Sequence, residues 1–193
     1  SDKVVCKHEF ATESRDLFTL GWTGTKGNIF YLHSIEPALN RFFSDFPNSQ
    51  LIVVSDGKYK SEFPLVEKRT VNIPWTIENE QKYLRIFDVG LMPLTTDCWA
   101  MGKAAFKLIL YFKHSVASIA SGFGYQTEFV VHGENALLAV DNDQWYESLR
   151  KLVEEPSLRK KLATAGFQVY ENSFSEDVIF SKYLGVLEKG QFV

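Results

Sequence analysis

The sequence predicts a doubly wound α/β domain, with a parallel sheet of about six strands and helices on both faces. Short apolar runs alternate with amphipathic segments along the chain, and turn residues separate them. The run QLIVVSDG (50–57) is apolar until its closing Asp-Gly, as expected of a strand that is buried on both sides. Regular alternation of such strands with helices favours a parallel sheet over an antiparallel one.

We expect the strands at 17–24, 50–57, 69–75, 88–94, 115–121 and 136–140. We expect the helices at 28–46, 77–87, 102–113, 127–135, 144–155, from Pro156 onward, and 175–189. Pro37 either bends the first helix or begins its main body. In a Rossmann-like arrangement of this kind, ligands bind beyond the carboxyl ends of the strands. The loops of interest are therefore 21–28, 55–60, 74–78, 94–103 and 121–127.

Composition narrows the class of protein. The chain has 193 residues, of which 45% are hydrophobic, enough for the core of one domain. The net charge is −3 and the 21 basic residues are spread along the chain, so the sequence has no cluster of positive charge of the kind that binds nucleic acid. Cys6 and Cys98 are far apart and form neither a disulfide framework nor a zinc motif, which fits a reducing cytoplasm. No apolar run approaches the ~20 residues that cross a bilayer.

The first candidate loop is GWTGTKGN (21–28), which follows a strand and opens a helix. Backbone N–H groups and the helix dipole receive phosphates at such a position. The glycines do not match the GxGxxG dinucleotide fingerprint, so an NAD-binding or flavodoxin-like domain is the weakest alternative. Gly24 permits a close approach of a phosphate or sugar, with help from Thr25 or Lys26. The alternative is that Gly24 binds nothing and serves only the backbone conformation of a turn.

The second candidate is a pair of lysines in the expected helix 102–113. Gly102 would begin this helix, so that Lys103 lies in its first turn and Lys107 one turn later on the same face. The neighbouring residues are mostly apolar, which indicates a largely buried helix. Two like charges on one stripe of such a helix repel each other, and they suit a diphosphate. The alternative is a solvated stripe whose lysines extend to water.

The third candidate is SGFGYQTE (121–128), another strand-to-helix loop. Glu128 can accept hydrogen bonds from a sugar hydroxyl, or it can stabilise the N-terminus of its own short helix. A metal site is not indicated, because Asn142 and Asp143 of the DND stretch are N-cap candidates and the histidines lack metal-ligand spacing. No GxSxG or Cys/His signature supports nucleophilic hydrolysis.

Six stretches in order carry a resemblance to a known family: FDVGLMPL (87–94), WAMGKAAFKL (99–108), YF (111–112), SIAS (118–121), GYQTE (124–128) and GENALLAV (133–140). From about residue 19 to 174, the chain resembles the C-terminal, nucleotide-sugar donor domain of a retaining GT-B glycosyltransferase of group 1 type. Relatives in the bacterial polysaccharide branch are the most similar. The resemblance implies one half of a GT-B fold, with 1–193 as a single donor-binding domain that lacks the N-terminal acceptor domain.

The resemblance also implies roles for the candidate residues. Lys103 and Lys107 would face the diphosphate of a nucleoside-diphosphate sugar, whose growing charge on departure is stabilised without a metal or other cofactor. Glu128 would be the catalytic carboxylate on the donor sugar. The glycine loops at Gly24 and Gly124, with Thr25, Lys26, Gly102 and Tyr125, would approach the phosphates and sugar, and Trp75 would lie near the base.

The chain departs from the family pattern at several of these positions. Gly102 and Leu110 stand where the family's E-x7-E motif has carboxylates on the sugar and on the ribose. Thr25 stands where the family has a basic residue after the first glycine, with Lys26 as a substitute, and Tyr125 replaces the second glycine of the GG-x-x-E loop.

We therefore expect a donor domain that serves transfer to a glycan or lipid-linked acceptor, inactive without the N-terminal domain. Its expected location is the cytoplasm, peripheral to the inner membrane in a longer chain. The alternative is a non-catalytic α/β interaction module derived from such an enzyme.

Overall fold

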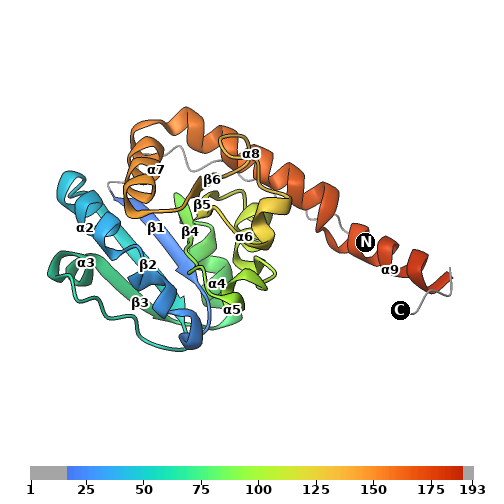
Figure 1. Cartoon of the computed structure of the whole chain (residues 1–193), viewed down its shortest axis with the longest axis horizontal. Coiled ribbons are helices and arrows are strands. Elements are labelled where there is room, and N and C mark those ends of the chain that lie inside the picture. Colours follow the sequence, from blue (N-terminus) through green and yellow to red (C-terminus); the bar gives the residue numbers. More distant parts are fainter. Residues whose placement is uncertain (1–16, 189–193) are drawn as a thin grey trace.

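The computed structural model describes residues 17–188, which contain a six-stranded parallel sheet (Figure 1). The strands are β1 (Phe18–Thr23), β2 (Ser49–Ser55), β3 (Thr70–Pro74), β4 (Val89–Met92), β5 (Ala117–Ser121) and β6 (Leu137–Ala139). Their spatial order is β3-β2-β1-β4-β5-β6, and every neighbouring pair is parallel. The order reverses between β1 and β4, which is the switch point of a doubly wound sheet. The predicted fold class and the six predicted strands are confirmed.

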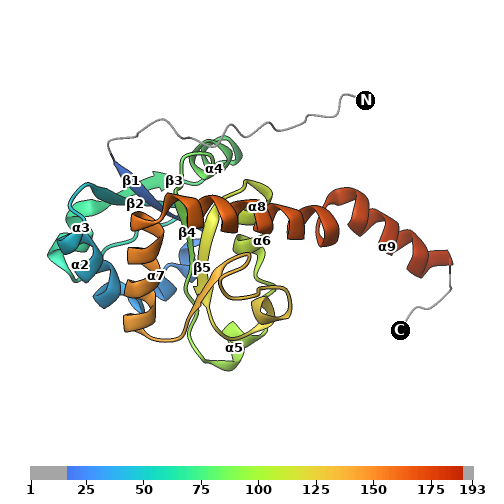
Figure 2. The same ribbon diagram turned by 90° about the horizontal axis from the view of Figure 1, so that it is seen from above.

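Most of the helices of two or more turns cover the two faces of this sheet, and shorter helical segments connect them. The longer helices are α2 (Glu36–Asp45), α4 (Ile77–Leu84), α6 (Phe106–Lys113), α7 (Asn142–Glu154), α8 (Pro156–Ser173) and α9 (Glu176–Glu188). The shorter segments are η1 (Lys26–Asn28), α1 (Phe30–His33), α3 (Pro64–Arg69), α5 (Cys98–Met101) and η2 (Tyr125–Glu128). Figure 2 shows that α9 continues beyond the end of α8 and extends away from the sheet.

The sheet separates two apolar cores. Alternate residues of β2 point to opposite faces, because successive side chains of a strand alternate. Leu51 and Val53 pack with α2, α3 and α7, whereas Ile52 and Val54 pack with α4, α6 and the end of α8. All four are buried, so the continuous apolar run in the sequence corresponds to a central strand that is covered on both sides.

The predicted helix at 28–46 is divided in the structure. α1 ends at His33 and α2 begins at Glu36, with Pro37 in its first turn, so Pro37 begins the main body of the helix. Proline is tolerated there because the first N–H groups of a helix have no intrahelical partner.

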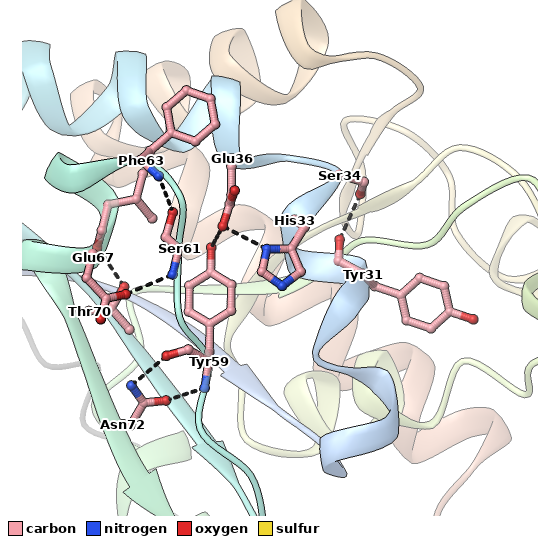
Figure 3. Close-up of polar contacts among 11 residues, drawn as sticks. Tyr31, His33, Ser34, Glu36, Tyr59, Ser61, Phe63, Glu67, Thr70 and Asn72 are labelled. Atoms are coloured by element: carbon pink, nitrogen blue, oxygen red, sulfur yellow. Dashed lines mark hydrogen bonds and ion pairs between the residues drawn. The ribbon is translucent and has the colours of Figure 1, made fainter.

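A polar cluster below α1 and α2 attaches them to the loop after β2 (Figure 3). The Glu36 carboxylate, only 4% exposed, accepts hydrogen bonds from the Tyr59 hydroxyl at 2.6 Å and interacts with Nδ1 of His33 at 2.9 Å. The Asn72 side chain of β3 bonds both backbone polar groups of Tyr59. Burial and the adjacent Glu36 raise the pKa of the Tyr59 phenol, so it stays a hydrogen-bond donor. This cluster fixes the position of the 56–63 loop.

The prediction of one helix over 102–113 is wrong. α5 ends at Met101, α6 begins at Phe106, and residues 102–105 between them are not helical. Ala105 adopts φ 51° and ψ 28°, a left-handed conformation that ends any continuous helix and costs a non-glycine residue about 1–2 kcal/mol. Lys103 therefore lies in the break, and Lys107 lies in the first turn of α6.

Two smaller predictions also need correction, and one helix was not predicted. Residues 127–135 do not form a helix, because only the 3-10 turn η2 forms, and Gly133 adopts φ 78° beside an isolated bridge between His132 and Ala136. The helix α3 was not predicted.

The N-cap of α7 is Asp141 rather than Asn142 or Asp143. Its carboxylate accepts a hydrogen bond from the backbone N–H of Gln144. Asp143 pairs with Arg41, and Asn142 bonds the backbone at the start of α2.

The region before β1 lies outside the described residues, and so does Cys6. Within the described part of the chain, no helix has the length and apolar character needed to span a membrane.

Candidate functional site

A cavity of about 510 Å³ opens at the switch point, beyond the carboxyl ends of β1 and β4. Thr23 ends β1 and Met92 ends β4, and both line the cavity. Its wall also includes Gly24, Thr25, Asn28, Asp56, Trp75, Glu80, Leu94, Lys103, Ala104, Ala105, Phe106, Lys107 and Leu110. This is the position at which doubly wound sheets bind their ligands.

The cavity exists because β1 and β4 separate at this end. Their pairing covers Leu20 with Val89 and Gly21 with Gly90, and it stops before the ends of the strands. The buried Tyr111 hydroxyl of α6 bridges the gap, because it donates to the Leu91 carbonyl at 3.1 Å and accepts from the Thr23 N–H at 3.4 Å. Burial raises the pKa of this phenol, so it remains protonated in this bridge. Nothing in the sequence pattern indicated this role of Tyr111.

Lys107 is the most perturbed cation of the cavity. Its ammonium lies 5.0 Å from the centre of the Trp22 ring. Burial, followed by repulsion from Lys103, lowers the pKa of Lys107 to about 8, and the Glu80 carboxylate opposes this shift. The positive end of the α6 dipole is also unfavourable for a lysine in the first turn of the helix. An anion in the cavity would relieve all three effects.

Lys103 reaches the same cavity from the break between α5 and α6. Its ammonium donates to the side-chain carbonyl of Asn28 at 2.8 Å and lies 5.2 Å from the centre of the Tyr31 ring. We expected the two lysines to share one face of a helix, and this expectation is wrong because Lys103 lies outside α6. The two side chains nevertheless line one cavity. The non-helical backbone of 102–105 makes this convergence possible, and no periodicity argument could have shown it.

The structure separates the three residues predicted in the first loop. Gly24 packs against Lys107, since a Cβ atom at position 24 would lie 2.7 Å from the lysine Cε and 2.9 Å from the Trp22 ring. Thr25 lines the cavity, and its hydroxyl accepts from the Asn28 amide at 3.1 Å. Lys26 does not line it; its backbone N–H donates to Asp56 at 2.5 Å and its side chain packs against Gly57.

Trp75 and Glu80 form the opposite wall. The Trp75 side chain is 46% exposed, and its indole N–H donates to Glu80 Oε1 at 3.1 Å. The Thr23 hydroxyl donates to the same oxygen at 2.5 Å. Glu80 was not recognised as a site residue from the sequence, because an acidic residue in the first turn of a helix is ordinarily explained by the helix dipole. Its position two residues after the candidate loop 74–78 is the signal that could have indicated it.

A second, more open hollow of about 850 Å³ adjoins the first. It is lined by Gly102, Ala104, Gly124, Tyr125, Thr127 and Glu128. Ala104 lines both hollows, so they share a wall at the break before α6. Gly124 adopts φ 83°, a conformation that favours glycine, and the Thr127 hydroxyl bonds its carbonyl. The predicted residues of the 121–128 loop thus lie together with Gly102, next to the lysine cavity.

Leu110 lines the lysine cavity with an apolar side chain, and Gly102 offers the second hollow no side chain at all. The carboxylates that line the two hollows are Asp56 and Glu80 in the first and Glu128 in the second. Among the described residues, no three His, Cys, Asp or Glu side chains are grouped closely enough to hold a metal ion.

The six-stranded parallel sheet with helices on both faces matches one half of a GT-B fold, a Rossmann-like domain whose switch point holds a cavity lined by Lys103 and Lys107. Comparison with solved structures supports this architecture. The chain is similar to the C-terminal domain of a group 1 family glycosyl transferase, LpcC, from Francisella tularensis, with a TM-score of 0.65 and 16% identity over 82% of this chain and 87% of that one.

Two longer proteins are also similar in fold. Anabaena HepE, solved in complex with UDP, has a TM-score of 0.74 and 14% identity over 90% of this chain and 49% of its own. Sucrose-phosphate synthase from Thermosynechococcus elongatus has a TM-score of 0.68 and 15% identity over 90% and 45%. This chain therefore spans about half the length of these two proteins. No protein-family model and no curated protein matches the sequence.

Proposed function

We propose that this chain is the donor-binding domain of a retaining glycosyltransferase of the bacterial polysaccharide branch. It binds a nucleoside-diphosphate sugar and serves transfer of the sugar to a glycan or a lipid-linked acceptor. The proposal includes a separate N-terminal domain that holds the acceptor, a cytoplasmic location peripheral to the inner membrane, and no requirement for a metal ion.

One observation carries the proposal: Lys103 and Lys107 converge on a cavity at the switch point of a GT-B half. Two ammonium groups that repel each other, one of them with a pKa lowered to about 8, form a site that gains stability when a diphosphate enters. The UDP complex of HepE supports a nucleotide in the same fold.

Fixed cations can stabilise the charge that develops on a departing nucleoside diphosphate, as a metal ion does in other enzymes. In this chain the lysines would take that role. Glu128, exposed at the second hollow beside Gly124, would face the donor sugar, and Trp75 would lie near the base.

Calorimetric titration tests the proposal. The chain is titrated with UDP, GDP, ADP and their common sugar conjugates, with and without magnesium. We expect one nucleotide to bind without metal, and we expect the double variant Lys103→Ala/Lys107→Ala to lose this binding while it keeps the fold by circular dichroism.

The matched control is Lys68→Ala/Lys151→Ala, which removes two exposed lysines of α3 and α7 that do not line the cavity. It should bind the nucleotide as the unchanged chain does. Unchanged affinity in the Lys103/Lys107 variant would contradict the diphosphate assignment, and failure of all three nucleotides to bind would contradict the donor role.

A second candidate function rests on α9. Its exposed apolar side chains are Ile179, Phe180, Tyr183, Leu184 and Leu187. Such a stripe on a helix that extends from the body is typical of an interaction surface. A non-catalytic interaction module would show this surface and no nucleotide binding, so the same titration distinguishes the two candidates.

A further inference from the structure

Glu80 is held in a defined position on the cavity wall. Its Oε1 atom accepts two hydrogen bonds, from the Trp75 indole N–H at 3.1 Å and from the Thr23 hydroxyl at 2.5 Å. Thr23 is the last residue of β1 and Trp75 directly follows β3, so the two donors come from two different strand ends. A carboxylate held from two sides is preorganised, and it needs no rearrangement to receive a ligand.

The other oxygen of Glu80, Oε2, accepts no hydrogen bond from residues 17–188. A carboxylate has about four lone-pair sites, and it accepts hydrogen bonds only. Glu80 acts on Lys107 electrostatically, yet the two do not form an ion pair within 4.0 Å, so space remains between the carboxylate and the ammonium. The cavity thus has cations at one wall and a hydrogen-bond acceptor at another.

This arrangement requires a ligand with an anionic group and, a short distance from it, O–H or N–H donors. In a nucleoside diphosphate, the group next to the diphosphate is the ribose, which carries two neighbouring hydroxyls. Phosphates at Lys103 and Lys107 would bring the ribose toward the Glu80 side of the cavity, because about 510 Å³ holds a nucleotide-sized ligand across its walls.

We propose that Glu80 binds the ribose hydroxyls of the nucleotide through Oε2 and so makes this site specific for ribonucleotides. The inference rests on the proposed function, and it assigns a residue of α4 to substrate specificity. Trp75 and Thr23 act as positioning residues, because they orient the carboxylate and do not need to touch the ribose.

The test compares UDP with 2′-deoxy-UDP and 3′-deoxy-UDP by calorimetric titration, or the matching analogues of GDP or ADP if one of these binds instead. The unchanged chain should lose affinity by about tenfold or more for at least one deoxy analogue, since a hydrogen bond to a charged acceptor is lost. Glu80→Gln should reduce that discrimination to about threefold or less, because it keeps an acceptor for Trp75 and Thr23 but removes the charge.

Glu78→Gln is the matched control. Glu78 lies on the same helix and has the same charge, but it does not line the cavity. This variant should discriminate between ribose and deoxyribose as the unchanged chain does. Chemical denaturation of each variant shows that it is folded, and Glu80→Ala serves as a second variant that should abolish discrimination.

The outcomes separate the two proposals. A nucleotide that binds with no preference for ribose, or Glu80→Gln with undiminished preference, overturns the role of Glu80 and leaves the donor proposal intact. Failure of UDP, GDP and ADP to bind overturns the donor proposal, and the role of Glu80 with it.

Discussion

At the scale of single residues, Lys107 links the stability of the domain to its proposed ligand. Burial of its ammonium beside Trp22, followed by repulsion from Lys103, lowers the pKa of Lys107 from 10.5 to about 8. The folded domain therefore tolerates an unfavourable charge at neutral pH. Such a cost is typical of groups whose task is to bind, because the compensating charge arrives with the ligand.

Nucleotide affinity should decline as the pH rises through about 8. Lys107 is charged below its pKa and neutral above it, so attraction for the diphosphate is complete at about pH 7 and weakens toward about pH 9. Calorimetric titration across this range measures the decline. Lys107→Met, which has no charge to lose, should bind more weakly and show a nearly flat profile, and an equally flat profile in the unchanged chain would contradict the role of Lys107.

Gly24 should be required for the position of the Lys107 ammonium. In Gly24→Ala, the new Cβ would lie 2.7 Å from the lysine Cε and 2.9 Å from the Trp22 ring, so the lysine side chain must move. We expect nucleotide affinity to fall by about tenfold, as for a lost charge-assisted contact. Gly27→Ala in the same loop is the control, since its Cβ meets nothing within 4 Å and should leave titrations unchanged.

At the scale of elements, backbone breaks matter more than regular segments for the site. The non-helical stretch between α5 and α6 brings Lys103 and Ala104 to the cavity, and left-handed Ala105 sets the direction in which α6 starts. On the other side, the Glu36 cluster holds the 56–63 loop against α1 and α2 (Figure 3). Asp56, which lines the cavity, is the first residue of that loop.

Tyr59→Phe should destabilise the domain by about 1–3 kcal/mol. The change leaves the buried Glu36 carboxylate without one of its two partners, and an unsatisfied buried group costs about that much. Urea unfolding measures the difference. Tyr31→Phe is the control, because the buried Tyr31 hydroxyl has no hydrogen-bond partner among the described residues and its removal should cost little or nothing. Equal losses in the two variants would contradict the assigned role of the cluster.

At the scale of the whole molecule, the two apolar cores and the projecting helix α9 contribute differently to the structure. The cores on the two faces of the sheet hold β1 and β4 so that their ends can separate and leave a cavity. α9 contributes little to either core, and it contacts the rest of the domain mainly through α8 and an ion pair between Lys113 and Glu176 at 3.5 Å.

Phe180→Ser combined with Tyr183→Ser should change the free energy of unfolding by less than about 0.5 kcal/mol, since both side chains are more than half exposed. Leu152→Ala in α7, within the buried core, should instead cost about 2–5 kcal/mol. Thermal and chemical unfolding measure both. A loss in the α9 variant comparable to that of Leu152→Ala would show that α9 belongs to the folded core after all.

The sequence alone determined the fold class and the region of the site. Apolar runs such as 50–57 specify central strands through burial on both faces, and their alternation with helices specifies a parallel sheet. The rule that ligands bind beyond the carboxyl ends then indicated the loops that contain Gly24, Trp75 and Lys103. These features follow from local pattern, which is why they could be predicted.

Only the tertiary structure decided how the site is assembled. The break before α6 depends on the left-handed backbone of Ala105. The sequence does not indicate this break, because alanine is typical of a continuous helix. The positions of Glu80 and Tyr111 depend on contacts with Thr23, a residue far away in the chain. Contacts of this kind arise from packing across the sheet, so no periodicity or spacing in the sequence encodes them in readable form.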